Sequence, residues 1–310
     1  MFGQSSDCAF GMVADVAVDD GGSVYVLDKG FDVIHVFDAT GEFLYDVGRK
    51  GEGPGEFWGP LCLDVGPDGR IYVAGKSGVI SVLLPDGRAA GFIDRSNHEL
   101  VRSIRVTSTG RVYTTSLDVF KETVIDEYTG DLGDGTYVRS FGEAYGRGKN
   151  VDPRTELVFG GGFLDLARDD TMYYVQMTPQ LVRVYGQAGD LLRTHRARFD
   201  ELGAPAEPDY TEGSVEYMVG PMANAIVCLG DLGFLTVLGY PQKGPGDPGE
   251  NVVDLYGEDG RLKCSSRLPG RFGVKCADAR ERIYVVEDRD DDEVVVRYDL
   301  AMNDLGAVIR

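Results

Sequence analysis

The chain repeats one pattern six times: a short apolar segment, a turn rich in Asp and Gly, and a second apolar segment with an aromatic residue near its start. In the first copy the apolar runs 13–18, 24–27, 33–37 and 43–47 are separated by turns such as Asp-Asp-Gly-Gly. Tight turns between runs of β-branched and aromatic residues predict antiparallel hairpins. Each copy is therefore predicted to be a four-stranded antiparallel meander.

The six copies align on their second strands. These strands read SVYVLD, RIYVAG, RVYTTS, MYYVQM, FLTVLG and RIYVVE, with aligned aromatic residues Tyr25, Tyr72, Tyr113, Tyr173, Phe234 and Tyr284. A recurring four-stranded unit is typical of a β-propeller, because one blade alone cannot bury both of its faces. The sequence thus predicts an all-β, six-bladed β-propeller with four antiparallel strands per blade. Residues 1–310 form one domain in this prediction, with blades at 13–57, 58–93, 100–142, 159–198, 220–268 and 271–310.

All six units look complete in chain order, and the last one ends in a short strand before residue 310. No strand is therefore expected from the opposite terminus, and the ring is expected to close by packing of unit six against unit one, helped by residues 1–10. Two irregular segments, 143–156 and 199–219, interrupt the repeats. Loops longer than about 12 residues are often lids or binding loops. Both segments precede a first strand, which favours a small-molecule site on that face.

Three stretches of the chain resemble NHL-type repeats. They read LDVGPDGRIYVAG, VYVLDKGFDVIHVFDATGEFL and GRKGEGPGEFWGP. The resemblance covers nearly the whole chain and is clearest in units one, two and six. It implies a six-bladed propeller but no single activity, since this fold family includes scaffolds, ligand binders, lactonases and lyases. In propeller enzymes of this kind the active site lies at the mouth of the central channel.

The charge of the chain narrows the choice of partners. Acidic side chains number 51 against 31 basic ones, so the net charge is −20. Such a surface repels phosphate backbones and anionic lipid, which excludes nucleic acid and membrane insertion as expected functions. A small-molecule ligand at the channel mouth or a protein partner is expected instead, with the chain a monomer.

The cysteine pattern and the N-terminal sequence bear on the compartment. The five cysteines form no CxxC pair, and Cys62, Cys228 and Cys276 each lie in the first strand of a unit, as reduced core thiols would. The N-terminal sequence has neither a basic start nor a long apolar stretch, unlike a signal peptide. As written, the chain is expected to be cytoplasmic; it would be extracytoplasmic if a signal has been trimmed from it.

Position in the repeat identifies candidate site residues. Residues just before a first strand or just after a second strand should share the face that carries the links between units. Candidate acid–base groups there are His98, Glu99 and Asp118, with Arg102 or Lys29 to stabilise negative charge. The candidate ligand-binding residues are Asp28, Lys29, Trp58, Lys76, Phe163, Gln176, Tyr240, Arg271 and Phe272.

A metal site is the other candidate. The three histidines, His35, His98 and His195, show no zinc spacing. Resemblance to calcium-dependent lactonase propellers, which use Glu, Asn and Asp from separate blades, suggests calcium as the ion, with Asn224, Glu287 and Asp288 as metal ligands. Oxygen ligands of this kind suit a hard cation. No cofactor other than calcium is suggested.

Three functions remain open from the sequence. The first is a propeller that binds a small molecule or a protein at the channel mouth, without chemistry. The second is a propeller enzyme, either a lactone hydrolase or a lyase or cyclase of a small metabolite, with or without calcium. The third is a sensor or scaffold piece. Carboxylates that converge in the channel would favour the enzyme.

Overall fold

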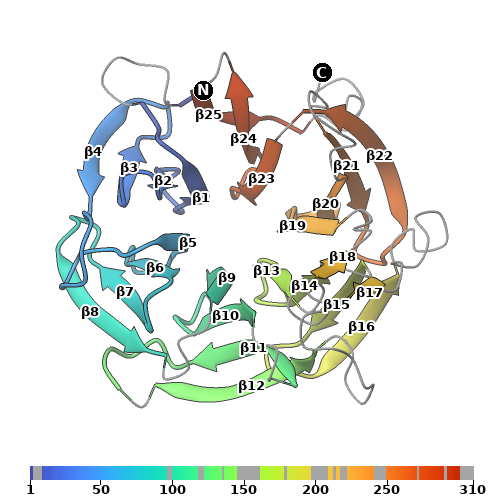
Figure 1. Ribbon diagram of the computed structural model, residues 1–310, viewed down its shortest axis with the longest axis horizontal. Coiled ribbons are helices and arrows are strands. Elements are labelled where there is room, and N and C mark those ends of the chain that lie inside the picture. The colour runs from blue at the N-terminus through green and yellow to red at the C-terminus, as the bar shows by residue number, and fades with distance from the viewer. Residues whose placement is uncertain are drawn as a thin grey trace.

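In a computed structural model of the protein, six antiparallel sheets are arranged radially around a central channel (Figure 1). The predicted six-bladed, all-β fold is confirmed. The structure describes residues 1–2, 9–95, 100–117, 122–134, 136–144, 161–177, 180–196, 209–211, 214–216, 222–240, 249–270, 272–289 and 292–300. Within these residues, blades one to five have four strands in sequence order and blade six has three.

The strands of each blade run in order from the channel outward. Blade one contains β1 (Val13–Val18), β2 (Val24–Asp28), β3 (Val33–Phe37) and β4 (Phe43–Val47). Blade two contains β5 (Pro60–Val65), β6 (Ile71–Gly75), β7 (Val79–Leu83) and β8 (Ala89–Asp94). Blade three contains β9 (Leu100–Val106), β10 (Val112–Leu117), β11 (Thr123–Tyr128) and β12 (Tyr137–Glu143).

The second half of the ring repeats this order. Blade four contains β13 (Gly162–Leu166), β14 (Met172–Gln176), β15 (Leu181–Tyr185) and β16 (Leu191–Arg196). Blade five contains β19 (Met222–Cys228), β20 (Phe234–Tyr240), β21 (Glu250–Tyr256) and β22 (Leu262–Pro269). Blade six contains β23 (Phe272–Ala277), β24 (Ile283–Arg289) and β25 (Asp292–Tyr298), and β17 (Asp209–Thr211) pairs with β18 (Ser214–Glu216) in a separate short hairpin.

The hydrophobic core is divided among the gaps between blades. Six clusters of buried side chains are present, and each joins two neighbouring blades, including blade six with blade one. The second strands supply the largest share of these side chains and are buried along their length, as every residue of β2 and β6 is. Burial on both faces is what a blade needs when it is packed between two others.

In blades one to four the hairpins between first and second strands share one turn conformation. Gly22, Gly69 and Gly110 have φ of 86°, 76° and 82°, the region that glycine adopts without steric cost. In blade four the residue at this place is Asp170, with φ 60°. The Asp-Gly and Asp-Asp pairs of the sequence therefore mark equivalent turns, since short polar side chains also tolerate this conformation.

The ring closes by packing of blade six against blade one, as expected, and the N-terminal end adds a main-chain pairing that was not expected. The backbone of Phe2 pairs in antiparallel fashion with Val295 in β25, with Phe2 N donating to Val295 O at 2.8 Å. The Phe2 side chain is only 2% exposed and packs edge-on against Phe37 at 5.4 Å between ring centroids. The N-terminal end thus contributes a main-chain pairing to blade six, which the apparent completeness of the units had hidden. The expected last strand of that unit lies outside the described residues.

In the part of the chain that the structure describes, no helix is long and apolar enough to cross a membrane.

Candidate functional site

The channel is lined by the innermost strands β1, β5, β9, β13, β19 and β23 (Figure 1). We call the end of the ring where these strands begin the link face, because the links between blades arrive there. We call the other end, which carries the hairpins between first and second strands, the hairpin face. The two ends differ in shape and in charge, so they are described separately.

Five of the six inner strands contain a β-bulge. Each bulge leaves one residue without a partner on the second strand, and these residues are Ala14, Leu61, Arg102, Asn224 and Lys275. A bulge re-aims the side chain of its extra residue. All five extra residues line a single cavity of about 330 Å³ on the link-face side of the channel. We call these five residues the bulge ring.

The link-face cavity combines apolar walls with a few polar groups. Phe163 of β13, the inner strand without a bulge, faces the cavity together with Leu61 and Ile226. Polar groups come from Arg102, Ser103, Asn224 and Lys275. An enclosed surface of this composition is typical of small-molecule sites.

Deeper in the channel lies a belt of charged residues. Asp64, Arg105 and Asp165 occupy equivalent places in blades two, three and four, each opposite the aligned tyrosine of its second strand. Arg105 Nε donates to Asp165 Oδ1 at 2.6 Å, and both side chains are nearly buried, at 12% and 13% exposure. Arg105 lines the cavities on both sides of the belt and so separates them.

The carboxylates of the channel also connect neighbouring blades. Asp15 accepts a hydrogen bond from Leu63 N at 3.1 Å, Asp64 accepts one from Val106 N at 2.7 Å, and Asp165 accepts one from Cys228 N at 2.7 Å. Each of these amides lies on the inner strand of the next blade, which has no further strand to pair with. The carboxylates therefore satisfy backbone groups that the edge of each sheet would leave open.

Burial and neighbouring charges shift the pKa values of these groups. Burial raises the pKa of Asp15, and it raises the pKa of Asp64 to about 6 even though Arg105 opposes this. Burial alone would lower the pKa of Arg105, but Asp165, Asp64 and Asp15 outweigh it and raise that pKa. Burial lowers the pKa of Lys275, whose Nζ donates to Ala14 O at 2.7 Å.

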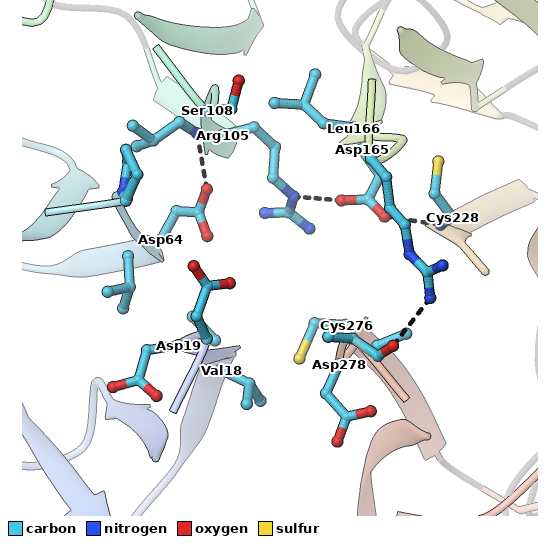
Figure 2. A pocket seen from close by; sticks show the side chains of 18 of the residues that line it. Val18, Asp19, Asp64, Arg105, Ser108, Asp165, Leu166, Cys228, Cys276 and Asp278 are labelled. Carbon is cyan, nitrogen blue, oxygen red and sulfur yellow. Dashed lines mark hydrogen bonds and ion pairs between the residues drawn. The ribbon is translucent and has the colours of Figure 1, made fainter. Parts of the chain in front are cut away.

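The hairpin face holds a second, more acidic cavity of about 470 Å³ (Figure 2). Asp64, Arg105 and Asp165 line it, and Figure 2 shows the carboxylates of Asp19 and Asp278 on the side opposite Arg105. Its acidic groups are largely engaged by the protein itself: Asp170 binds Ser108 at 2.6 Å and Asp278 binds Arg282 at 2.6 Å. Arg168 reaches from blade four to Ala279 O of blade six at 2.9 Å. These contacts stabilise the hairpin face.

Arg102 stands apart from the other charged residues of the channel. Its side chain is partly buried, and its Nε has no hydrogen-bond partner within the described structure. Burial lowers the pKa of Arg102, and no carboxylate of the described residues offsets that loss of hydration. An uncompensated guanidinium facing a cavity is a group suited to bind an anion.

The structure brings some of the sequence-predicted residues together. Arg102, Phe163 and Asn224 line the link-face cavity. Asn224 also lines an adjoining, open cavity of about 480 Å³ between blades five and six, with Tyr240, Phe272 and Asp288. Five of these six were predicted as residues of this face, whereas Asn224 was predicted as a metal ligand; that any of them binds a ligand stays a prediction. His98, Glu99, Asp118 and Arg271 lie outside the described residues, as does most of the two irregular segments.

Other predicted residues are occupied or remote from the cavities. Asp28 is fully buried, accepts hydrogen bonds from four backbone amides, including Gly11 N at 2.6 Å and Gly30 N at 2.7 Å, and has its pKa lowered to about 2. Gln176 is 2% exposed and accepts from Arg183. The remaining three residues, Lys29, Trp58 and Lys76, are exposed on the link side of blades one and two.

The predicted metal ligands do not form a cluster. Glu287 is bound by Arg289 at 2.8 Å and by the hydroxyl of Tyr298, whereas Asn224 donates to Asn251 at 3.4 Å. Within the described residues, no three His, Cys, Asp or Glu side chains lie close enough together to hold a metal ion. Calcium therefore stays a prediction, and we assign it no step.

His35 is a buried strand residue, in line with its alternation with apolar neighbours in the sequence. Its Nδ1 lies 2.7 Å from Asp46 Oδ1 and its Nε2 lies 3.5 Å from Asp28 Oδ2. Burial acts to lower the pKa of His35, but Asp28 and Asp46 outweigh it and raise the pKa. The folded protein therefore binds the His35 proton more tightly than the unfolded chain does.

Changing His35 to Gln should reduce stability more at about pH 5 than at about pH 9. A raised folded-state pKa gives stabilisation that is complete below the unfolded pKa of about 6.5 and is lost as the pH rises through the folded value. Urea denaturation of parent and H35Q across this range measures the difference. A difference that stays constant with pH would show that His35 is neutral throughout.

The charged belt, together with Asp15 and Lys275, is the part of the site that position in the repeat did not predict. Asp15, Asp64, Arg105, Asp165 and Lys275 all lie within first strands, whereas the predicted residues were taken from the ends of strands. A signal was present: each is a charge inside a short apolar run, as in PLCLDV and GFLDL. Charges are almost never fully buried unless they are paired, so such residues indicate a polar channel.

Comparisons with known proteins agree with this architecture. A family model described as a 6-bladed beta-propeller, DUF5128, matches residues 4–77. No curated protein sequence matches the chain. Among solved structures, a member of the DUF4221 family from Bacteroides vulgatus is 12% identical, with a TM-score of 0.66 over 96% of this chain and 94% of that one. Streptogramin B lyase is 14% identical, with a TM-score of 0.54 over 93% and 83%. The WD40 repeats of RRP9 are 14% identical, with a TM-score of 0.53 over 89% and 87%. The chain is similar to each of these in fold: it is a six-bladed β-propeller.

Proposed function

We propose that the protein binds a small organic molecule in the link-face cavity. The observation that carries the proposal is the bulge ring, in which five blades each direct one side chain without a ladder partner into the same enclosed space. Because these residues have no partner on the second strand, their side chains can contact a ligand without disturbing the pairing of the sheet. The NHL-type relationship of the repeats belongs to the same proposal, supported by the motifs in units one, two and six.

Binding is proposed ahead of catalysis. The carboxylates that reach the channel are engaged by backbone amides of the next blade or by Arg105. A hydrolase, lyase or cyclase is the alternative function, and it would use His98, Glu99 and Asp118 with Arg102 as the stabiliser of negative charge. Of these four, only Arg102 lies in the described structure, where it faces the cavity.

Filling the cavity should abolish binding without unfolding the protein. Gly273 lines the cavity, and a Cβ at this position would contact only Lys275, with Cε at 3.5 Å and Nζ at 3.8 Å. Gly273→Leu therefore places a bulky side chain in the cavity at little steric cost. We expect hits from a library of neutral and charged small molecules, detected by ligand-observed NMR with the parent protein, to lose their signals with G273L.

Ala279→Leu is the matched control, because Ala279 lines the hairpin-face cavity and is exposed there. Hits should bind A279L as they bind the parent. Hits that survive G273L but are lost with A279L would move the site to the hairpin face and refute the proposal. Thermal unfolding of both variants, with midpoints near that of the parent, establishes that each is folded.

A further inference from the structure

Arg102 is the one cation of the link-face cavity with no counter-charge in the described structure. Arg105 is paired with Asp165, and Lys275 donates to Ala14 O and lies near Asp15. Arg102 has neither an ion pair nor a partner for its Nε among the described residues. It also occupies a bulge, between Val101 and Ser103, so the ladder does not dictate where its side chain points.

The local charge of this cavity is opposite to that of the protein. The whole chain carries −20, yet the cavity lining holds three cations, Arg102, Arg105 and Lys275, and one acid, Asp15. The carboxylate of Asp15 is already bound by Val16 N at 3.0 Å and Leu63 N at 3.1 Å. An anion that enters from the link face therefore meets one free guanidinium and no free carboxylate of the described lining.

The rest of the lining restricts the kind of anion. Leu61, Leu100, Phe163, Ile226 and Val274 provide apolar walls. A single uncommitted guanidinium balances a single negative charge, and its planar fork matches the two oxygens of a carboxylate. The lining also holds Lys275, but its ammonium already donates to Ala14 O, so the match is to one negative charge on Arg102.

We propose that the link-face cavity binds a small, largely apolar molecule that carries one carboxylate, and that Arg102 binds this carboxylate. The inference rests on the proposed function and adds the chemical class of the ligand. The absence of a partner for Arg102 among the described residues then has a reason, since an uncompensated, partly buried charge lowers stability but can serve binding.

The test uses benzoate, benzamide and phenyl phosphate as probes, with Arg102→Met as the variant. Benzoate should bind the parent at least about tenfold more tightly than benzamide, because hydrogen bonds to a charged partner are the stronger ones. Arg102→Met should weaken benzoate binding by at least about tenfold and leave benzamide binding unchanged. Titration calorimetry measures all three probes against both proteins.

Two controls separate a ligand contact from a structural role. Arg261→Gln removes the same charge from a side chain that is 89% exposed, and benzoate should bind this variant as it binds the parent. The unfolding temperature of ligand-free R102M should equal or exceed that of the parent, because the mutation removes an uncompensated charge. A structural arginine would instead leave R102M less stable.

Each contrary result overturns a defined part of the inference. Absence of benzoate binding, or equal binding of benzoate to R102M and parent, refutes the assignment to Arg102. Tighter binding of phenyl phosphate than of benzoate refutes the carboxylate class. If library hits are lost with Gly273→Leu but none depends on Arg102, the proposed binding function stands and this inference fails.

Discussion

Replacing Arg105 with Met should lower the free energy of unfolding by about 3–5 kcal/mol, because it leaves buried charges without a partner. Arg105 is the guanidinium at the centre of the charged belt, where Asp165 lies 2.6 Å away and Asp64 and Asp15 also face it. Urea denaturation at about pH 8 measures the loss. The loss should shrink at about pH 5, because burial holds the pKa of Asp64 near 6 and protonation removes the repulsion between carboxylates.

The double variant R105M/D165N provides the control for this prediction. Removing both members of a buried pair costs less than removing one, so the double variant should be more stable than R105M alone. A loss below about 1 kcal/mol for R105M would show that water enters the belt and hydrates the carboxylates.

Replacing Phe2 with Ala should lower the free energy of unfolding by about 3–5 kcal/mol, the range observed for large buried aromatic side chains. Phe2 is 2% exposed and packs between blades one and six, against Phe37 at 5.4 Å and Tyr284 at 6.1 Å between ring centroids. Loss of this side chain opens the gap between blades six and one. Equilibrium denaturation measures the effect.

Phe31→Ala is the matched control, since Phe31 belongs to blade one but is 57% exposed. Its change in unfolding free energy should stay within about 0.5 kcal/mol. If F2A were as mild as F31A, closure would rest on the rest of the interface between blades one and six. Phe2→Leu should fall between these two, because it keeps an apolar side chain in the gap.

The fold was predictable from the sequence because the same pattern of strands and turns recurs in six units. Turn residues and buried second strands recur, so an ambiguous unit such as the one around Phe234 is clarified by its neighbours. Ring closure was harder to predict, because a single residue near the N-terminus pairs with the last described strand, and one residue shows no strand pattern in the sequence. Only the structure shows that Phe2 meets Val295.

The site was predictable in part. Arg102 and Phe163 were predicted for this face from the repeat and Asn224 as a metal ligand, and the structure places all three at one cavity. The bulges that direct the side chains of the bulge ring into the cavity could not be predicted from the sequence, because a bulge depends on how two strands pair. Asp28 is a prediction of the opposite kind. Its place at the end of a strand suggested a ligand contact, yet its carboxylate accepts hydrogen bonds from four backbone amides.

The inner strands carry two kinds of residue, those that join the blades and those that face the link-face cavity, and this separation affects how the sequence can evolve. Asp15, Asp64 and Asp165 hold adjacent blades together, so exchanging any of them puts the scaffold at risk. The bulge ring takes no part in the ladder, so a member without a hydrogen bond to a neighbouring blade, such as Arg102, can be exchanged with less risk to stability. A gene encoding this fold could therefore reach a new ligand preference through single codon changes at a few sites, without first acquiring compensating mutations. The same sites are the natural starting library for directed evolution of this scaffold.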